Sequence, residues 1–318
     1  MSDLLVVGDC NVDVIVSGPD VTPVFGDVEK MVDAATLTIG GSSSITACGA
    51  GELGVSTAMV TRVGDDPLGN YLLDEVAGFG VNVDYFIMDP EVPTGMTIAL
   101  VRPGDRGILT AAGTIDRLSA DDVPAALLSS ARHLHVGAYY LQTALRPGLP
   151  QLFAAARAAG TTTSVDPNWD PTGRWDGLLE LLQWTDILFV NAGEASAIAK
   201  EDDLVRAMRY LSSGGTTVVV KQGAAGASAM RGGEAIHAPA LDIEPVDTVG
   251  AGDTFTAGFL GAFLVGASLE DALALGCACG SLSTRGVGGT GRQPDAAEAQ
   301  RAAATLRPKV SALATGAA

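Results

Sequence analysis

The 318-residue chain has few of the residues that bind metals or form disulfides. It contains four cysteines and three histidines, and no two cysteines have C-x-x-C spacing. The cysteines are Cys10, Cys48, Cys277 and Cys279. Because no His/Cys cluster has zinc spacing either, we expect neither a disulfide framework nor a structural metal. A chain of this length forms a hydrophobic core without such cross-links.

Positive charge is also scarce, since 19 basic residues face 37 acidic ones and the formal net charge is −18. A surface this acidic repels phosphate backbones and anionic lipids, so we expect no nucleic-acid or membrane partner. No run of about 18 apolar residues predicts a transmembrane helix. The first residues carry Asp3 where a signal peptide has basic residues. We therefore expect a cytoplasmic protein.

Short apolar runs without alternation recur along the chain and predict buried strands. These runs cover residues 4–7, 58–61, 133–136, 162–165, 187–190 and 218–220. Helical patterns separate most of them, for example at 68–79, 151–159 and 202–211. This alternation predicts an α/β fold with a parallel sheet. From Ala251 onward the pattern is helical almost throughout.

Two stretches, about 14–39 and 92–110, interrupt the alternation and show no helical period. The first contains prolines, glycines and β-branched runs. The second reads as two strands around a turn at residues 102–105. We expect both stretches to form a small β-sheet inserted into the α/β body as a lid, within one domain that spans residues 1–318.

Two patterns resemble known sites but lack the structural context that those sites need. Residues 286–291 match G-x-G-x-x-G, yet they follow a helical pattern rather than a strand, which disfavours a dinucleotide site. His133 and His135 lie on one face of a predicted strand. Because His237 is the only other histidine, we interpret them as a hydrogen-bonded pair rather than a metal site.

The segment Asp247–Thr254 (DTVGAGDT) stands directly before a predicted helix. Gly250, Ala251 and Gly252 can present bare backbone N–H groups at the positive end of that helix, which makes an anion-binding site. Asp253 then falls in the first turn. A carboxylate beside an anion hole is understandable if it accepts a proton from a hydroxyl while the hole stabilises a transferring phosphoryl group. The alternative is that Asp253 caps the helix and the glycines close a turn.

Together with four other segments, DTVGAGD resembles the signature motifs of the ribokinase-like (PfkB) family of carbohydrate and nucleoside kinases. The others are Gly40–Gly41 with the helical stretch that follows, Val63–Gly69 (VGDDPLG), Asn191–Glu194 (N-x-x-E) and Lys221–Gly226. All five occur in the order typical of the family. The resemblance implies a ribokinase-like three-layer α/β/α fold, with a central, mostly parallel sheet and a small β-sheet lid.

The resemblance also implies roles for particular residues. Asp253 would be the general base toward the acceptor hydroxyl, and the amides of Gly250, Ala251 and Gly252 would form the anion hole. ATP and Mg²⁺ would be bound by Asn191, Glu194, Lys221, Gly223 and Gly226, with Glu194 holding Mg²⁺ through water. Asp247, Val249, Ser283 and Gly288 resemble a monovalent cation site of the family, which K⁺ would fill.

The acceptor side is expected to begin directly after the first strand. Asn11 and Asp13 alternate onto one face and can hydrogen-bond a polyol, while Gly40 and Gly41 let a substrate approach the backbone. Family members bind sugar hydroxyls with the corresponding segment. The alternative for Asp13 is a charge at the hinge of the lid.

The sequence departs from the family pattern at Ile45, which stands where an Asn that touches substrate hydroxyls is expected. Replacing an amide by a branched alkyl group removes a donor and an acceptor, so we expect a changed substrate choice. Ser43, Ser44 and Thr46 are candidates to compensate.

Three further positions bear on the acceptor. Tyr140 and Gln142 stand where ribokinases place an acid, and a tyrosine can stack on a ring. Arg106 in the lid either contacts an anionic substituent or is a charge at a hairpin tip. Asp166 follows a buried strand, at the end where open α/β sheets bind ligands, and we interpret it as a polar support of the site.

These features together predict an ATP-dependent kinase that transfers the γ-phosphoryl group to a hydroxyl of a sugar or sugar-like molecule. A nucleoside kinase on the same fold and a non-catalytic sugar-binding relative are the alternatives. The resemblance also suggests a homodimer through the lid, whose exposed strands need a cover.

Overall fold

The computed structural model describes residues 2–102 and 105–311. Its main sheet has ten strands, and those from β5 to β11 run parallel, while β12, β13 and β14 are antiparallel. The order across the sheet is β14 (Lys309–Ser311), β13 (Glu234–Ala238), β12 (Ala227–Arg231), β11 (Thr217–Lys221), β10 (Ile187–Asn191), β9 (Thr162–Val165), β8 (His133–Val136), β1 (Leu4–Val7), β4 (Thr57–Gly64) and β5 (Asn82–Asp89). The mostly parallel sheet predicted from the sequence is confirmed.

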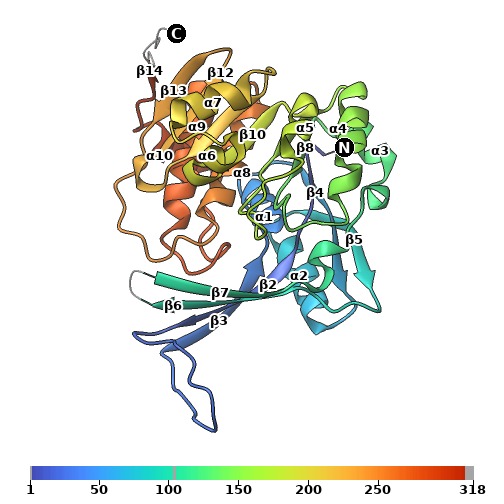
Figure 1. Cartoon of the computed structure of the whole chain (residues 1–318), viewed down its shortest axis with the longest axis vertical. Helices are drawn as coiled ribbons and strands as arrows, with labels where there is room; N and C mark the ends of the chain where they lie inside the picture. The colour runs from blue at the N-terminus through green and yellow to red at the C-terminus, as the bar shows by residue number, and fades with distance from the viewer. Residues whose placement is uncertain (1, 103–104, 312–318) are drawn as a thin grey trace.

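Helices cover both faces of this sheet, which gives three layers (Figure 1). One face packs against α1 (Ser42–Glu52), α2 (Pro67–Gly78), α8 (Ala251–Leu264), α9 (Leu269–Ser283) and α10 (Ala296–Ala303). The other packs against α3 (Ala125–Ser130), α4 (Leu149–Ala158), α5 (Leu178–Leu181), α6 (Ala192–Ala199) and α7 (Leu204–Ser212). Alternate residues of β1 serve the two layers, since Leu4 and Val6 join the first core and Leu5 and Val7 the second.

A second sheet of four strands projects from the body below α1 and α2 (Figure 1). Its order is β3 (Ala34–Gly40), β2 (Asn11–Ser17), β6 (Met96–Arg102) and β7 (Asp105–Ala111). The inserted sheet is therefore present, but its first strand begins at Asn11, three positions before the predicted boundary. The predicted turn at Pro103 and Gly104 lies outside the described residues.

Two other expectations about the elements need correction. The stretch after Ala251 is not wholly helical, because β14 adds an edge strand beside β13. Strands β5, β12 and β13 were also not predicted. Each of the three mixes polar residues such as Asn82, Arg231 and Glu234 with its apolar ones, so none shows a continuous apolar run.

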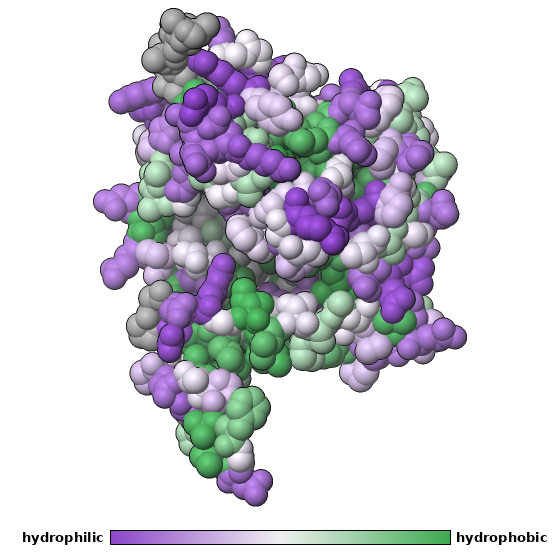
Figure 2. Space-filling model, in the orientation of Figure 1, coloured by the Kyte–Doolittle hydropathy of each residue, from purple (hydrophilic) through white to green (hydrophobic). Residues whose placement is uncertain are grey.

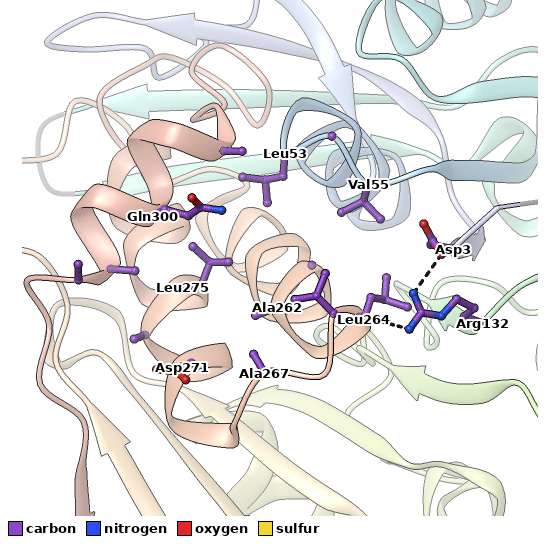
Figure 3. Close-up of a pocket in the computed structure, with 17 residues that line it drawn as sticks. Asp3, Leu53, Val55, Arg132, Ala262, Leu264, Ala267, Asp271, Leu275 and Gln300 are labelled. Carbon is purple, nitrogen blue, oxygen red and sulfur yellow. Dashed lines mark hydrogen bonds and ion pairs between the residues drawn. The ribbon is translucent and has the colours of Figure 1, made fainter.

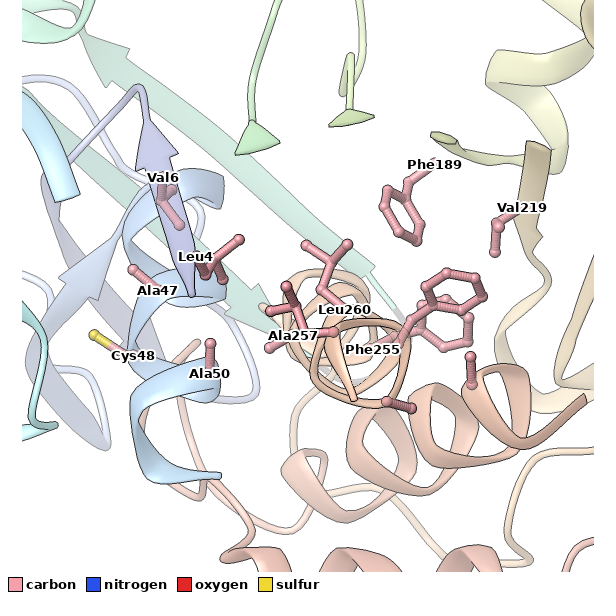
Figure 4. Close-up of a cluster of buried hydrophobic side chains, with 14 of the residues drawn as sticks. Leu4, Val6, Ala47, Cys48, Ala50, Phe189, Val219, Phe255, Ala257 and Leu260 are labelled. Carbon is pink, nitrogen blue, oxygen red and sulfur yellow. The ribbon is translucent and has the colours of Figure 1, made fainter. Parts of the chain in front are cut away.

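The core between the sheet and α8 is built on aromatic side chains (Figure 4). Phe259 is 1% exposed, and its ring meets that of Phe189 edge to face, with centroids 5.2 Å apart. The ring of Phe255, one turn earlier in α8, stacks on the ring of Phe259, with centroids 6.3 Å apart. This packing fixes α8 against β10, and thereby fixes where the first turn of α8 lies over the sheet.

Replacing Phe259 with Ala should therefore lower the free energy of unfolding by about 3–5 kcal/mol, because a large buried ring leaves a cavity. Phe25→Ala is the matched control, since Phe25 is 97% exposed. Chemical denaturation of both variants measures the difference. A Phe259→Ala variant as stable as the Phe25→Ala variant would contradict this account of the core.

Candidate active site

The N-terminus of α1 is capped by a side chain from outside the helix. The residue at its N-cap position is Gly41, which adopts a φ of 96° and has no side chain to offer. Asp9, just after β1, takes over this role, because its two carboxylate oxygens accept the N–H groups of Ser42 and Ser43, both at 2.9 Å. Burial raises the pKa of Asp9. The link fixes the start of α1 to the end of β1.

The start of α8 meets the start of α1 through Ser42 and Asp253. The hydroxyl of Ser42 donates to a carboxylate oxygen of Asp253 at 2.6 Å. The N-cap of α8 is Gly250, in a left-handed conformation at φ 72°, so Asp253 is three positions inside the helix and does not cap it. The capping alternative for Asp253 is therefore wrong.

The carboxyl group of Asp253 is tuned by its surroundings. Burial raises its pKa to about 7, and the charge of Asp166 adds to this effect. The ammonium group of Lys221 and the hydrogen bond from Ser42 act in the opposite direction. Near neutral pH the group therefore exists in both protonation states, which suits a residue that accepts a proton and returns it.

The loop before α8 presents backbone N–H groups beside Asp253. The first N–H groups of a helix have no partner within it, and the helix dipole adds positive potential there. Ala251 is the partial exception, because its N–H also donates to the carbonyl of Thr248, at 3.3 Å. The segment Gly250–Gly252 thus has the form of the predicted anion hole.

A glycine-rich loop after α9 packs against the segment Gly250–Gly252. A Cβ on Gly250 would lie 2.5 Å from the Cα of Gly289, and a Cβ on Gly289 would lie 2.3 Å from Cδ1 of Ile45. Ile45 is 3% exposed, so its side chain is packed against this loop. Gln293 ties the loop to α8 by donating to the carbonyl of Gly289 (2.8 Å) and to the hydroxyl of Thr254 (3.0 Å).

The same loop, residues 286–291, contains the G-x-G-x-x-G match. It lies between α9 and α10, and no helix begins directly after it. The prediction that this match lacks the strand–loop–helix context of a dinucleotide site is confirmed.

The segments expected to hold a monovalent cation lie side by side. The carboxylate of Asp247 accepts the N–H of Val249 (3.0 Å) and the N–H of Gly288 (2.9 Å). The carbonyl of Thr284 accepts the N–H groups of Val246 and Asp247. Ser283 is buried, and its hydroxyl donates to the carbonyl of Gly280. The structure thus brings together the two loops that were predicted to form this site.

Asn191 and Glu194 form a reciprocal capping box at the start of α6. The Asn191 side chain accepts the N–H of Glu194 at 2.9 Å, and Glu194 accepts the N–H of Asn191 at 2.8 Å. Glu194 is 5% exposed, and burial together with the nearby charge of Asp166 raises its pKa. It is therefore not a solvent-facing acid, and one of its oxygens stays free for a further partner.

Lys221 and the two nearby glycines line the end of β11. The Lys221 ammonium pairs with Asp166 at 2.5 Å. Gly223 has open space where a Cβ would be, whereas a Cβ on Gly226 would lie 2.0 Å from the carbonyl of Ala238. Gly223 thus leaves room for a ligand, and Gly226 is required by the packing of its own loop.

Asn11 and Asp13 lie together where the lid joins the body. The amide of Asn11 donates to the carboxylate of Asp13 at 2.8 Å. A Cβ on Gly40 would lie 1.9 Å from that carboxylate, so only glycine fits opposite it. Burial raises the pKa of Asp13 to about 6. The group is thus a partly buried hydrogen-bonding centre rather than a free surface charge.

Three predicted acceptor residues make no hydrogen bond to Asn11 or Asp13 among the described residues. Tyr140 and Gln142 are 3% and 0% exposed. The ring of Tyr140 packs between Tyr139 and Trp175, and the amide of Gln142 donates to the carbonyl of Gly137. Arg106 is exposed on β7 and lines a cleft of about 990 Å³ between the lid and residues 245–248.

The histidine pair is buried inside the sheet. His133 and His135 both hydrogen-bond the hydroxyl of Ser164, at 2.7 and 2.8 Å, and burial lowers the pKa of each to about 3. The hydrogen-bonded interpretation is confirmed. Cys10 is buried as well, and burial raises the pKa of its thiol, which makes it unreactive.

An apolar pocket of about 500 Å³ lies at the other end of α8 (Figure 3). It is bordered by Leu53, Val55, Leu264 and Leu275, and by the ion pair of Arg132 with Asp3 at 3.2 Å. Because it opens at the amino end of β1, whereas Asp253 lies at the carboxyl end, the pocket is separate from the site. Among the described residues, no helix is long and apolar enough to span a membrane.

The sequence interpretation missed Ser42 and Asp9 as members of the site. In each case a neighbouring glycine marks the position in the sequence. Ser42 follows the Gly40–Gly41 pair directly, and Asp9 follows the glycine that ends β1. What could not be foreseen is that these two segments meet the start of α8, since that contact joins residues 211 positions apart.

The chain resembles known proteins over most of its length. Residues 1–296 match the family model described as pfkB family carbohydrate kinase. A fructokinase of Klebsiella pneumoniae is 31% identical over 282 residues, covering 82% of this chain and 91% of that protein. An ATP-dependent ribose-1-phosphate kinase of Halopiger xanaduensis is 30% identical, covering 81% and 84%. The structure of Arabidopsis thaliana ribokinase complexed with ribose and ATP superimposes with a TM-score of 0.82 at 25% identity, over 95% of this chain and 98% of that one.

The hydrogen bond from Ser42 predicts how Asp253 titrates. Ser42→Ala should raise the pKa of Asp253 further above its present value of about 7, because the ionised form loses a donor. Carbon-13 NMR of the aspartate carboxyl groups measures this. Ser44→Ala is the matched control, since the Ser44 hydroxyl donates to the carbonyls of Gly40 and Gly41 instead. An unchanged or lowered pKa of Asp253 in the Ser42 variant would refute the account of this site.

Proposed function

This chain belongs to the pfkB family of carbohydrate kinases and is an ATP-dependent sugar kinase, and we propose that Asp253 and the segment Gly250–Gly252 carry its phosphoryl transfer. The observation that supports this most is the position of Asp253. A carboxyl group with a pKa of about 7 lies in the first turn of α8, directly beside backbone N–H groups that can hold an anion. Base and anion hole thus share one helix start.

In the proposed reaction, Asp253 takes the proton of the acceptor hydroxyl as its oxygen attacks the γ-phosphorus of ATP. The new oxygen–phosphorus bond forms while the bond between the γ-phosphorus and the β–γ bridging oxygen breaks, and ADP leaves. The N–H groups of Gly250–Gly252 stabilise the negative charge on the transferring group. The Ser42 hydroxyl orients the carboxylate of Asp253 toward the acceptor.

Asn191 and Glu194, at the end of β10, fit Mg²⁺ bound through water. Glu194 is 5% exposed, and one of its carboxylate oxygens is free of the capping box. Mg²⁺ prefers few carboxylates and keeps several waters. When bound, the ion would neutralise charge on the phosphates of ATP. Asn191 and Glu194 would hold it through water, and Lys221, Gly223 and Gly226 would border the nucleotide.

We also propose that K⁺ binds between the two loops that Asp247 joins. Within the described part of the chain, the carbonyls of Asp247 and Val249 accept no backbone hydrogen bond, so both are available to a cation. Ser283 and Gly288 would complete this site from the second loop. A cation there would hold the loop of Gly288 and Gly289 against Gly250.

For the acceptor, Asn11 and Asp13 with Gly40 and Gly41 form the proposed hydroxyl-binding centre. The relatives named fructokinase and ribose-1-phosphate kinase make fructose and ribose 1-phosphate the first acceptors to test. Arg106, which lines the cleft between the lid and residues 245–248, would meet an anionic substituent. The roles of Ile45, Tyr140 and Gln142 in substrate choice stay predictions.

The cytoplasm is the compartment that we propose for this reaction. The transfer consumes ATP, and all four cysteines are free and buried, which fits a reducing environment.

ADP release with Mg²⁺–ATP and a panel of sugars, sugar phosphates, sugar acids and nucleosides tests the proposed chemistry. A sugar class should stimulate turnover, and Asp253→Asn should lower it by about a hundred- to ten-thousand-fold. Asp271→Asn is the matched control, because Asp271 occupies the same first-turn position in α9 and lies away from the site. Full activity of the Asp253 variant would show that another group takes the proton.

The outer face of the lid supports a homodimer. One row across the sheet contains Leu37, Val14, Ile98 and Leu109, all apolar, whereas the opposite face has Asp13, Thr38 and Thr97 near the site. Leu37 and Leu109 are 45% and 61% exposed. Figure 2 shows apolar side chains gathered over the lid and its tip. We propose that a second copy of the chain covers this face, since an apolar sheet face of this kind can pair with its own copy about a twofold axis.

Light scattering after size exclusion tests the dimer. The wild type should have twice the 32.2 kDa mass of the chain, and Leu37→Lys combined with Leu109→Lys should give a monomer. Val265→Lys, which adds the same charge at an exposed apolar position of the body, should stay dimeric. A monomeric wild type at micromolar concentration would rule the proposal out.

A further inference from the structure

Asp166 and Lys221 form the most deeply buried ion pair among the described residues. Asp166 follows β9 and Lys221 ends β11, on either side of β10. Their side chains are 1% and 16% exposed, and the ammonium lies 2.5 Å from one carboxylate oxygen. The hydroxyl of Thr256, on α8, lies 3.5 Å from the same oxygen. The pair therefore lies between the sheet and the first turns of α8.

The ammonium group also lies directly beside the proposed anion hole. A Cβ on Gly252 would be 3.2 Å from Nζ of Lys221, with the side-chain carbons of the lysine at 3.6 Å. Gly252 is thus the one position of the hole where a side chain would press on the lysine. No larger residue fits there unless Lys221 moves.

We propose that Asp166 is a positioning residue that holds the Lys221 ammonium beside Gly252, so that a fixed full charge completes the anion hole of Gly250–Gly252. This inference rests on the proposed function of that site. It assigns to the ion pair a task in phosphoryl transfer beyond holding β9 to β11.

The physical reason lies in the flexibility of lysine. Its ammonium is a compact point charge on a four-carbon stem, and holding it in one place costs conformational entropy. An ammonium that is already fixed where negative charge develops stabilises the transition state without first reorganising. A buried carboxylate on a strand end is a rigid anchor for this purpose. The arrangement also explains why an ion pair is retained in an interior position where apolar side chains are often as stable.

Several charged groups face this ammonium, and together they decide its state. Burial lowers the pKa of Lys221, but the carboxylates of Asp166, Asp253 and Glu194 outweigh this and raise it. His135 on β8 is the other titratable neighbour, and it stays neutral because burial and Lys221 lower its pKa to about 3. Lys221 therefore remains charged throughout the pH range in which Asp253 titrates.

The two partners act on Asp253 in opposite directions. Lys221 lowers the pKa of Asp253, whereas Asp166 raises it. Removing the lysine charge should therefore move the acidic limb of the pH–rate profile to higher pH. Removing the Asp166 charge should move that limb to lower pH while the rate at the plateau falls. Because both charges act on Asp253 through space, the shifts alone do not identify the role of the pair. A pair with a purely structural role would leave kcat at the plateau unchanged.

The test measures kcat, the KM for ATP and the pH profile of three variants, namely Lys221→Met, Asp166→Asn and the double variant. We expect kcat to fall about a hundredfold or more in Lys221→Met, as when one donor of an oxyanion hole is removed. Asp166→Asn should lower kcat at least about tenfold, because the ammonium is no longer held in place. The double variant should match Lys221→Met, since Asp166 acts only through the lysine.

Asp89→Asn is the matched control, because Asp89 pairs with Arg62 at 3.1 Å in another partly buried ion pair, away from the site. Asp89→Asn should leave kcat and the acidic limb of the pH–rate profile unchanged. If Asp166→Asn does not fold, the double variant still decides the question, because it leaves no unpaired ammonium in the interior. A double variant whose kcat equals that of Lys221→Met supports the proposal.

Two outcomes overturn the inference. One is a plateau kcat of Asp166→Asn within about twofold of the wild type, whatever the shift of its pH profile, and the other is a double variant whose loss equals the product of the single losses. The proposed function fails separately, if Asp253→Asn stays active. An inactive Asp253→Asn together with active Asp166 and Lys221 variants would leave the proposed function standing and remove only this inference.

Discussion

The site depends on the close meeting of two helix starts, those of α1 and α8, at the carboxyl end of β1. Both ends carry positive potential from their unpaired N–H groups, so they would repel without acidic residues between them. Asp9 satisfies the first N–H groups of α1, and Asp253 lies in the first turn of α8. The bond from Ser42 to Asp253 joins the two helices at this point. Small residues make the approach possible, since a Cβ on Gly8 would lie 2.1 Å from the Ser43 hydroxyl and one on Gly49 would lie 2.9 Å from Ala257.

At Asp253, the protonated form favours stability, whereas only the ionised form can accept a proton. The pKa of Asp253 is raised to about 7, well above the value of about 4 in an unfolded chain. The folded protein therefore binds this proton more tightly than the unfolded one. The resulting contribution to stability is complete below about pH 4 and is lost as the pH rises through about 7. If Asp253 is the proposed base, its ionised form accepts the proton in the pH range where ionisation lowers stability.

The sequence predicted the layers and most of the motif residues because those depend on local signals. The buried strands appear as unbroken apolar runs, and the glycines of Gly250–Gly252 stand before a clear helical pattern. The antiparallel strands β12 and β13 lack such a signal. Comparing Ile45 with the family's motif position did not reveal its packing role. Its contact with Gly289 depends on a loop more than 240 positions away in the sequence. Ser42 and the pairing of Asp166 with Lys221 were missed for the same reason, since both contacts join distant segments.

The most direct test of the central claim is a crystal structure of the Asp253→Asn variant with Mg²⁺–ATP and an acceptor found by the turnover assay. The account predicts that the γ-phosphoryl group lies on the N–H groups of Gly250–Gly252, with an acceptor hydroxyl within hydrogen-bond reach of residue 253 and near Asn11 and Asp13. A γ-phosphoryl group bound away from the start of α8, or an acceptor whose hydroxyl groups all lie far from residue 253, would contradict it.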